Sequence, residues 1–152
     1  MTELATSADF VVRPAEDGDL GYVRKTWLQE HAQSSGWIDA VGGGAVYFRE
    51  HQRARDAAIE RGAVVVACRP SVRSGICGFA VTGPGDLVHF VYVKPRWRRL
   101  GVARLLLAPL LEREGVTATH ETTMSRARDR GTSLVPWPAG WTFNPYPFLR
   151  TA

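Results

Sequence analysis

Three short apolar runs, rich in β-branched residues, follow one another in the middle of this sequence and constrain its fold most strongly. They are Ala63–Cys68, Ile76–Val81 and Leu87–Val93. Each has the length and composition of a buried strand, and turns separate them, the first expected over Arg69–Gly75. Strands joined by short turns usually pair as antiparallel neighbours. The sequence therefore predicts a three-stranded meander.

Helical patterns flank this meander. Apolar residues at helical spacing predict helices over about 20–31, over about 45–61 and from about 101 onwards. Further strands are expected over 10–14 and 116–123, then a short basic helix over 124–134 and an irregular tail over 135–149. Asp17 or Asp19 would cap the first helix, Gly62 would end the second, and Pro109 would bend the third. This mixed order predicts an α/β (α+β) fold with a mostly antiparallel central sheet flanked by helices.

Length and composition exclude several classes of protein. The chain has 152 residues, of which 45% are hydrophobic, enough for one domain with its own core and too many for a disordered chain. No apolar run approaches the ~20 residues of a membrane span, and residues 1–9 lack the pattern of a secretory signal. Cys68 and Cys77 are too few for a disulfide scaffold or a zinc site. We therefore expect a cytoplasmic single-domain protein with no metal and no membrane partner.

The basic residues are almost all arginine. Nineteen basic residues face fifteen acidic ones, and only Lys25 and Lys94 are lysines. Arginine suits planar, bidentate recognition of phosphate and carboxylate. A GC-rich genome would produce the same bias, so composition alone allows a polyanionic ligand without naming one.

One segment combines strand, basic loop and helix start. The run Tyr92–Ala103 reads YVKPRWRRLGVA, a strand that enters a glycine-containing loop before a helix. Backbone N–H groups at a helix start bind anions, Gly101 permits close approach, and Arg98 and Arg99 add positive charge. The segment therefore predicts a pyrophosphate site. It is neither a Walker loop nor a dinucleotide fingerprint. The alternative is an arginine-rich solvated turn.

These residues resemble the GNAT superfamily of acyl-CoA-dependent N-acyltransferases. The family signature, Arg/Gln-x-x-Gly-x-Gly/Ala after a strand, is matched by residues 98–103. The Val-x-Pro that often precedes it is supplied by Val93-Lys94-Pro95. Residues 10–20 look like the family's first strand and helix entry, and the element order agrees over about 10–143, which leaves an aromatic and proline-rich tail over 135–152.

The resemblance implies a splayed strand pair that binds acetyl-CoA, or another acyl-CoA, as co-substrate. The backbone from Val91 to Val93 would hydrogen-bond the pantetheine arm, and the N–H groups from Arg99 to Ala103 would hold the pyrophosphate between basic side chains. The implied cofactor residues are Val91, Tyr92, Val93, Arg98, Arg99, Leu100, Gly101, Val102 and Ala103. An amine would attack the thioester directly, which requires a base and an acid.

His89 is the candidate base. Side chains alternate along a strand, so His89, Val91 and Val93 are expected on one face, where many family members carry a carboxylate. The alternative is a histidine with no catalytic role. Tyr92 is expected on the opposite face, packing or lining an acyl pocket. His120, in the last strand, is expected to be a core or edge residue.

Two further tyrosines and a histidine are candidates. Tyr47 and His51 lie one helical turn apart and would bind substrate, unless they form an ordinary helix face. The position of the family's usual tyrosine acid is taken by Pro136, so Tyr146 from the tail, or water, would protonate the leaving thiolate.

The leading hypothesis is therefore an N-acyltransferase acting on a small-molecule or protein amine. One alternative is a phage-type enzyme that modifies DNA bases, with nucleic acid held by the aromatic tail and by Arg126, Arg128 and Arg130. Another is a non-catalytic CoA-binding module. Homodimers are common in the family, and the resemblance allows one here.

Overall fold

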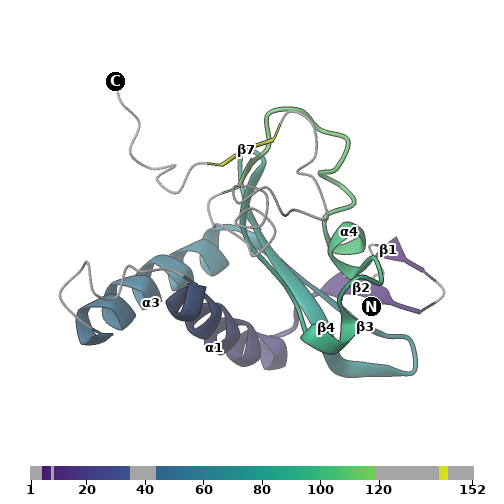
Figure 1. Cartoon of the computed structure of the whole chain (residues 1–152), viewed down its shortest axis with the longest axis horizontal. Coiled ribbons are helices and arrows are strands. Elements are labelled where there is room, and N and C mark those ends of the chain that lie inside the picture. The colour runs from purple at the N-terminus through teal and green to yellow at the C-terminus, as the bar shows by residue number, and fades with distance from the viewer. Residues whose placement is uncertain (1–4, 8, 35–43, 119–140, 144–152) are drawn as a thin grey trace.

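A seven-stranded sheet forms the centre of the computed structural model, which describes residues 5–7, 9–34, 44–118 and 141–143 (Figure 1). Its strands lie side by side in chain order: β1 Ala5–Thr6, β2 Val11–Pro14, β3 Ala63–Arg69, β4 Val72–Gly83, β5 Leu87–Val93, β6 Thr117–Ala118 and β7 Thr142–Phe143. Neighbours are antiparallel from β1 to β5, whereas β5–β6 and β6–β7 are parallel pairs. The predicted mixed fold is confirmed, and β3, β4 and β5 are the predicted meander.

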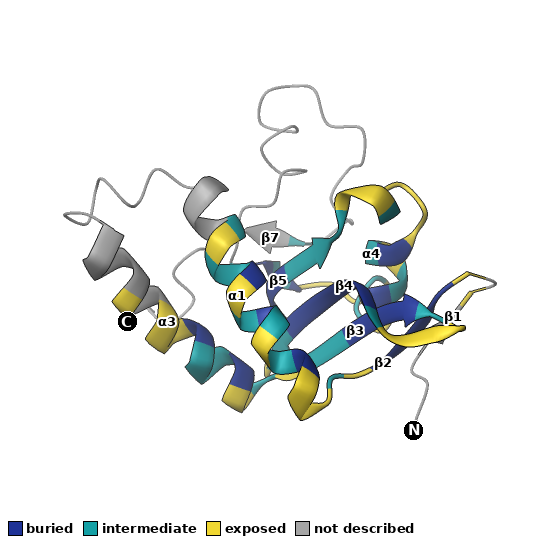
Figure 2. Cartoon of the chain, turned by 90° about the horizontal axis from the view of Figure 1, so that it is seen from below, coloured by how far each residue is buried: buried dark blue, intermediate teal, exposed yellow. Residues whose placement is uncertain are grey.

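Helices cover both faces of this sheet. They are α1 Asp17–Ser34, α3 Gly44–Arg61, the short 3-10 helix η1 Pro95–Trp97, and α4 Val102–Leu106. Val23 of α1 and Ile59 of α3 pack with Phe79 on one face, which we call the α1 face. Val102 of α4 packs with Phe10 on the other, the α4 face. Figure 2 shows the buried residues concentrated in the central strands between these layers.

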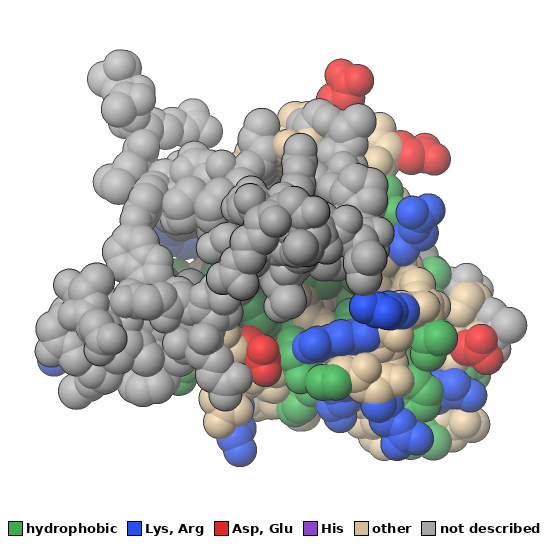
Figure 3. Space-filling model, in the orientation of Figure 1, with side chains coloured by type: hydrophobic (Ala, Val, Ile, Leu, Met, Phe, Trp, Pro, Cys, Tyr) green, Lys and Arg blue, Asp and Glu red, His purple; other side chains and the backbone are tan. Residues whose placement is uncertain are grey.

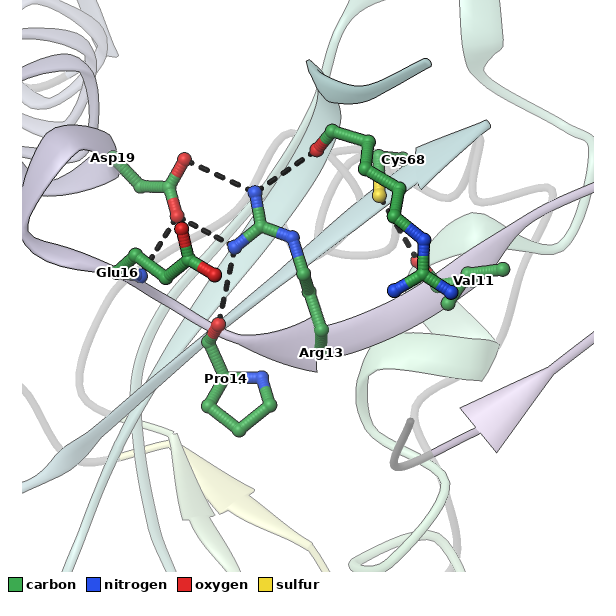
Figure 4. A network of polar contacts seen from close by, with 7 residues as sticks. Val11, Arg13, Pro14, Glu16, Asp19 and Cys68 are labelled. Carbon is green, nitrogen blue, oxygen red and sulfur yellow. Dashed lines mark hydrogen bonds and ion pairs between the residues drawn. The ribbon is translucent and has the colours of Figure 1, made fainter. Parts of the chain in front are cut away.

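The start of α1 is held by a buried ion pair with β2 (Figure 4). Arg13 donates to the two carboxylate oxygens of Asp19 at 2.7 and 3.2 Å, and to the Arg73 carbonyl at 2.9 Å. Asp19 also accepts the Glu16 N–H at 2.8 Å, as in a capping box. Of the two predicted caps, Asp19 therefore makes the capping bond, and α1 begins earlier than predicted. The hydrogen bond from Arg13 lowers the pKa of Asp19.

Gly62 follows α3 as predicted, but for a different physical reason. A glycine that ends a helix commonly has a left-handed backbone, yet the structure gives Gly62 no positive φ. A Cβ built at this position would stand 1.9 Å from the Thr82 carbonyl oxygen and 2.8 Å from that of Ala58. The glycine therefore serves close packing of the helix end against β4.

The helix after β5 is much shorter than its apolar stripe predicts. α4 ends at Leu106, because Pro109 has no N–H to continue the hydrogen-bond ladder. The Ala108 N–H instead reaches the Leu105 carbonyl at 3.4 Å, and Leu110 bonds to Leu107 at 2.8 Å. A series of turns replaces the predicted bent helix.

The remaining boundaries differ in detail. β4 begins at Val72, so the predicted turn over Arg69–Gly75 shrinks to residues 70–71. Only 117–118 of the predicted strand over 116–123 lies in the described part of the chain, as β6. The predicted helix over 124–134 lies outside it, as does most of the tail. No described helix is long and apolar enough to span a membrane.

Candidate functional site

β5 is paired with β6 only at its beginning. Leu87 lies opposite Thr117 and Val88 opposite Ala118, in parallel register. Within the described residues, no strand pairs with Val91–Val93 on that side. Among the described residues, the second half of β5 therefore has an unpaired backbone edge on this side.

The hydrogen bonds of β5 show which backbone groups face this edge. The Lys94 N–H donates to the Cys77 carbonyl of β4 at 2.9 Å. In an antiparallel pair the direction alternates along the strand, so Tyr92 also bonds toward β4 while Val91 and Val93 face the other way. Consistent with this, the Val93 carbonyl accepts a hydrogen bond from Nε of Arg98 at 2.7 Å. The edge thus presents strand-like donors and acceptors to a ligand.

A tightly bent loop continues from this edge into α4. Two of its residues have left-handed backbones, Arg99 with φ 65° and Gly101 with φ 83°. The Leu105 N–H makes the first helical hydrogen bond, to the Gly101 carbonyl at 3.0 Å. The N–H groups of residues 102–104 consequently have no acceptor within the helix. Since α4 is little more than one turn long, these N–H groups would contribute more to anion binding than a helix dipole would.

The loop is strongly basic. Figure 3 shows Lys and Arg side chains gathered on the surface around α4 and this loop. Within the described residues, no carboxylate forms an ion pair with the loop's cations, which are Lys94, Arg96, Arg98, Arg99 and Arg104. Guanidinium groups with no carboxylate partner among the described residues, next to N–H groups that lack a helical acceptor, form a site suited to phosphate.

Two supports of this loop are not visible in the sequence motif. Trp97 packs edge-on against Phe10 at 5.8 Å, and the guanidinium groups of Arg96 and Arg69 lie 4.7 and 5.2 Å from its ring centre. Gly78 of β4 lets β5 come close, because a Cβ there would stand 2.6 Å from the Tyr92 carbonyl oxygen. The loop is therefore held against the sheet by packing that its own sequence does not reveal.

His89 lies on the other face from the one predicted. Val81 pairs with Phe90 and Thr82 with Val88, so the register skips His89, which forms a β-bulge. Its ring lies 6.4 Å from that of Trp27 on the α1 face. The prediction that His89 shares a face with Val91 and Val93 is therefore wrong, because a bulge interrupts the alternation.

The surroundings of His89 are those of a core residue. Its side chain is 7% exposed, and burial lowers its pKa, so the imidazole is neutral at pH 7. A Cβ at Gly83 would meet Nε2 at 2.7 Å, which shows how tightly the ring is enclosed. The assignment of His89 as a base stays a prediction.

Tyr92 lies on the α1 face, as predicted. Its ring is 5.8 Å from that of Phe79, and the Arg98 guanidinium lies 5.7 Å from its centre. Burial raises the pKa of Tyr92, and the negative charge of Glu30 raises it further. The phenol is therefore protonated at neutral pH and lies beside the free edge of β5.

Solved structures with a similar fold include acetyltransferases. No family model matches the sequence, and no curated protein matches it. A putative acetyl transferase from Pyrococcus furiosus is 12% identical over 85% of this chain and 96% of its own, with a TM-score of 0.54. A GCN5-related N-acetyltransferase from Rhodopseudomonas palustris is 15% identical over 86% and 82%, with a TM-score of 0.52. The chain has the GNAT fold.

Another solved structure matches over a smaller share of its length. Apo YjaB from Escherichia coli is 19% identical over 67% of this chain, with a TM-score of 0.47, and the chain spans 64% of that protein. The two higher TM-scores carry the fold assignment.

The GNAT fold brings the predicted cofactor residues together. The β5 edge at Val91–Val93 leads directly into the loop and helix start at residues 98–103, as the resemblance implied. Leu100 is 57% exposed in this loop, whereas Val102, the first residue of α4, is buried in the core and can contribute only its backbone. The roles of these residues in binding acyl-CoA stay predictions.

Other candidates in this GNAT fold are only partly described. Tyr47 and His51 lie on α3, one turn apart as predicted, but their side chains lie outside the described part of the structure. Tyr146 and His120 lie outside it altogether. Sequence reasoning also missed a polar stripe on α1, which is formed by Tyr22, Thr26 and Glu30. Their spacing of four residues, which places them on one side of a helix, could have indicated this stripe from the sequence.

Proposed function

We propose that this chain is an N-acyltransferase that moves an acetyl or related acyl group from acyl-CoA to a primary amine. The observation that carries the proposal is the continuity of the β5 edge with the basic loop. No described strand pairs with Val91 and Val93 on one side, and the chain continues from them to the left-handed Arg99 and Gly101. The arginines of this loop form no ion pair with a described carboxylate. The GNAT fold, found in proteins described as acetyltransferases, supports the same conclusion.

The residues present fit the chemistry of acyl-CoA. The pantetheine arm carries amides, which match the backbone groups of Val91 and Val93 along the strand edge. The pyrophosphate is a doubly charged anion, which matches the N–H groups of residues 102–104 and the guanidinium groups of Arg98 and Arg99. When bound, acyl-CoA supplies the acyl group as a thioester. Arg98 then has to release or share the Val93 carbonyl that it holds in the free protein.

The protein's contribution to the reaction would be mainly orientation and exclusion of water. A thioester reacts directly with an uncharged amine once both are held at bonding distance. Backbone donors along β5 would fix the acyl donor, and the acceptor would approach from one face of the sheet. Arg126, Arg128 and Arg130, on which the DNA-modifying alternative rests, lie outside the described residues, and no described contact favours that alternative.

A pair of glycine substitutions tests the proposal. Gly101 and Gly85 both have left-handed backbones, with φ 83° and 75°, and a Cβ at either would meet no atom within 4 Å. Valine at either position should therefore cost at least about 1–2 kcal/mol of backbone strain. Gly85 lies in the β4–β5 turn, at the other end of β5 from the loop, so Gly85→Val is a matched control.

We expect acetyl-CoA to bind the wild-type chain in a calorimetric titration. Gly101→Val should weaken this binding about tenfold or more, equivalent to roughly 1.4 kcal/mol, while Gly85→Val should leave it within about twofold. Release of free thiol on addition of a primary amine distinguishes an enzyme from a non-catalytic CoA-binding module. The proposal is wrong if acetyl-CoA does not bind, or if the two glycine variants bind it equally well.

A further inference from the structure

The side chain of Arg98 folds back from the basic loop onto the end of β5. Its Nε donates a hydrogen bond to the Val93 carbonyl at 2.7 Å, and its guanidinium carbon lies 5.7 Å from the centre of the Tyr92 ring. The backbone of Arg98 is also held, since its N–H reaches the Pro95 carbonyl at 3.3 Å. This exposed arginine therefore contacts the strand instead of extending into solvent.

The carbonyl that Arg98 holds is a group that an extended ligand would need. The Lys94 N–H bonds to β4, so the groups of Val93 face the side of β5 on which no described strand pairs with residues 91–93. The proposed function assigns the amides of the pantetheine arm to this side. In the free protein, Arg98 therefore occupies an acceptor that the arm would use.

The guanidinium group of Arg98 has a stronger alternative partner in a phosphate. Within the described residues Arg98 forms no ion pair, so its hydrogen bond to Val93 joins a cation to a neutral carbonyl. A phosphate adds the attraction of opposite charges and accepts two parallel hydrogen bonds from one guanidinium. Gly101 follows three residues after Arg98, so an anion at this loop lies close to the side chain. A phosphate bound there would draw Arg98 away from Val93.

We infer that Arg98 determines donor specificity as a latch, which covers the Val93 carbonyl until a phosphate binds the loop. This inference rests on the proposed function. A thioester without phosphate has to displace Arg98 unaided. When the diphosphate of acyl-CoA occupies the loop, the guanidinium turns to the anion, and the Val93 carbonyl becomes available to an amide of the pantetheine arm. The chain thereby selects thioesters that carry phosphate over those that do not.

The latch differs in its consequences from an arginine that only attracts phosphate. Removing a purely attractive arginine would leave the affinity for a phosphate-free thioester unchanged. The latch opposes such a thioester, so its removal improves binding. Because the opposing contact is one exposed hydrogen bond, whose net contribution is small, we expect an improvement of about fivefold.

The first test compares two acyl donors that differ in their phosphates. S-acetylpantetheine carries the thioester and the amides of acetyl-CoA but no phosphate, and the Kd of each donor is measured by NMR titration of the intact chain. We expect Arg98→Met to bind S-acetylpantetheine about fivefold more tightly than the wild type does, and acetyl-CoA about tenfold less tightly. The preference for acetyl-CoA should therefore fall about fiftyfold.

Arg104→Met is the matched control for this comparison. It removes an exposed arginine of α4, next to the same loop, whose side chain makes no hydrogen bond to described residues. We expect it to weaken acetyl-CoA binding less than Arg98→Met does, and to leave the Kd of S-acetylpantetheine within about twofold. Opposite effects on the two donors are thus expected for Arg98→Met and not for the control.

The second test follows the latch in the wild-type chain, without a change of sequence. The probe is inorganic pyrophosphate alone, and the readout is the NMR signal of the Lys94 amide, whose peptide group contains the Val93 carbonyl. Pyrophosphate should move this signal toward its position in Arg98→Met, because both changes free the carbonyl from Arg98. The same addition should leave the signal of Arg98→Met nearly in place.

The outcomes distinguish the latch from the proposed function. If acetyl-CoA does not bind the wild-type chain, both are wrong. If it binds, but Arg98→Met holds S-acetylpantetheine no more tightly than the wild type does, the latch is wrong and the donor site stands. A Lys94 signal that saturating pyrophosphate leaves unmoved in the wild-type chain would also overturn the latch.

Discussion

The first half of β5 is enclosed by its neighbours, whereas no strand among the described residues pairs with one edge of the second half. Leu87 and Val88 pair with β6, and the bulged His89 and Phe90 lie against Trp27 in the core. From Val91 onwards, no described strand pairs on that side. This strand of seven residues thus has two parts. We call the enclosed residues 87–90 the sealed half, and residues 91–93, with one edge that no described strand pairs, the open half.

The difference shows how a short sheet can carry a binding edge. An unpaired strand edge is normally a liability, because its N–H and C=O groups seek partners. Here the sealed half anchors the strand, and the open half leads into a basic loop. We expect substitutions in the sealed half to change stability, and those in the open half to change binding.

The largest effect on stability should come from Phe90→Ala. Phe90 is 3% exposed and stacks on Trp27 at 5.5 Å and on Phe79 at 5.7 Å. Removing a fully buried phenyl ring leaves a cavity, so we expect a loss of about 3–5 kcal/mol in the free energy of unfolding, measured by urea denaturation.

The comparison for this variant is Val91→Ala, one residue further along. Val91 is only half-buried, so its truncation should cost about 1 kcal/mol. Similar losses for the two variants would contradict the division of β5 into a sealed and an open half.

Much of the fold follows from local patterns. β5 has the predicted bounds, because an apolar run of β-branched residues between two turns leaves little choice of element. The strand, basic loop and helix start at residues 92–103 follow from the sequence because the glycine and arginine spacing there constrains the backbone locally. The early end of α4 is also local, although we predicted a bend at Pro109 where the helix stops.

The features that sequence reasoning missed depend on distant parts of the chain. The face of His89 is decided by the register between β4 and β5, which no pattern within β5 reveals. The need for glycine at position 62 comes from the Thr82 carbonyl. Glu30 resembles any polar residue of a surface helix until α1 is placed beside Tyr92. The geometry of the basic loop was therefore predictable from the sequence, whereas features that depend on contacts between distant segments were not.

His89 should have a smaller effect on the free energy of unfolding, and this effect depends on pH. Burial lowers its pKa in the folded chain below the ordinary value near 6.5, so the unfolded chain binds more protons between these two values. The stabilisation is complete above about pH 6.5 and is lost as pH falls through the lower folded pKa. We expect wild-type stability to decrease in that window, as measured by urea denaturation at a series of pH values.

The control for this pH effect is His89→Gln, which cannot titrate. Its stability should change less between pH 7 and pH 5 than that of the wild type, although its absolute stability is expected to be lower. Parallel pH profiles for the two proteins would mean that His89 is not enclosed as the bulge implies.

The smallest effect on stability should come from Arg98→Met in the open half. The variant loses the hydrogen bond to the Val93 carbonyl and the cation over Tyr92, but the side chain is exposed, so the cost should be about 1 kcal/mol or less. Acetyl-CoA affinity should nevertheless fall about tenfold, since a guanidinium assigned to the pyrophosphate is gone. Arg104→Met removes an exposed arginine of α4 that makes no hydrogen bond to described residues, and it should weaken binding less. A large loss of stability with unchanged affinity would instead make Arg98 a structural clasp, and the open half of β5 would then resemble the sealed half.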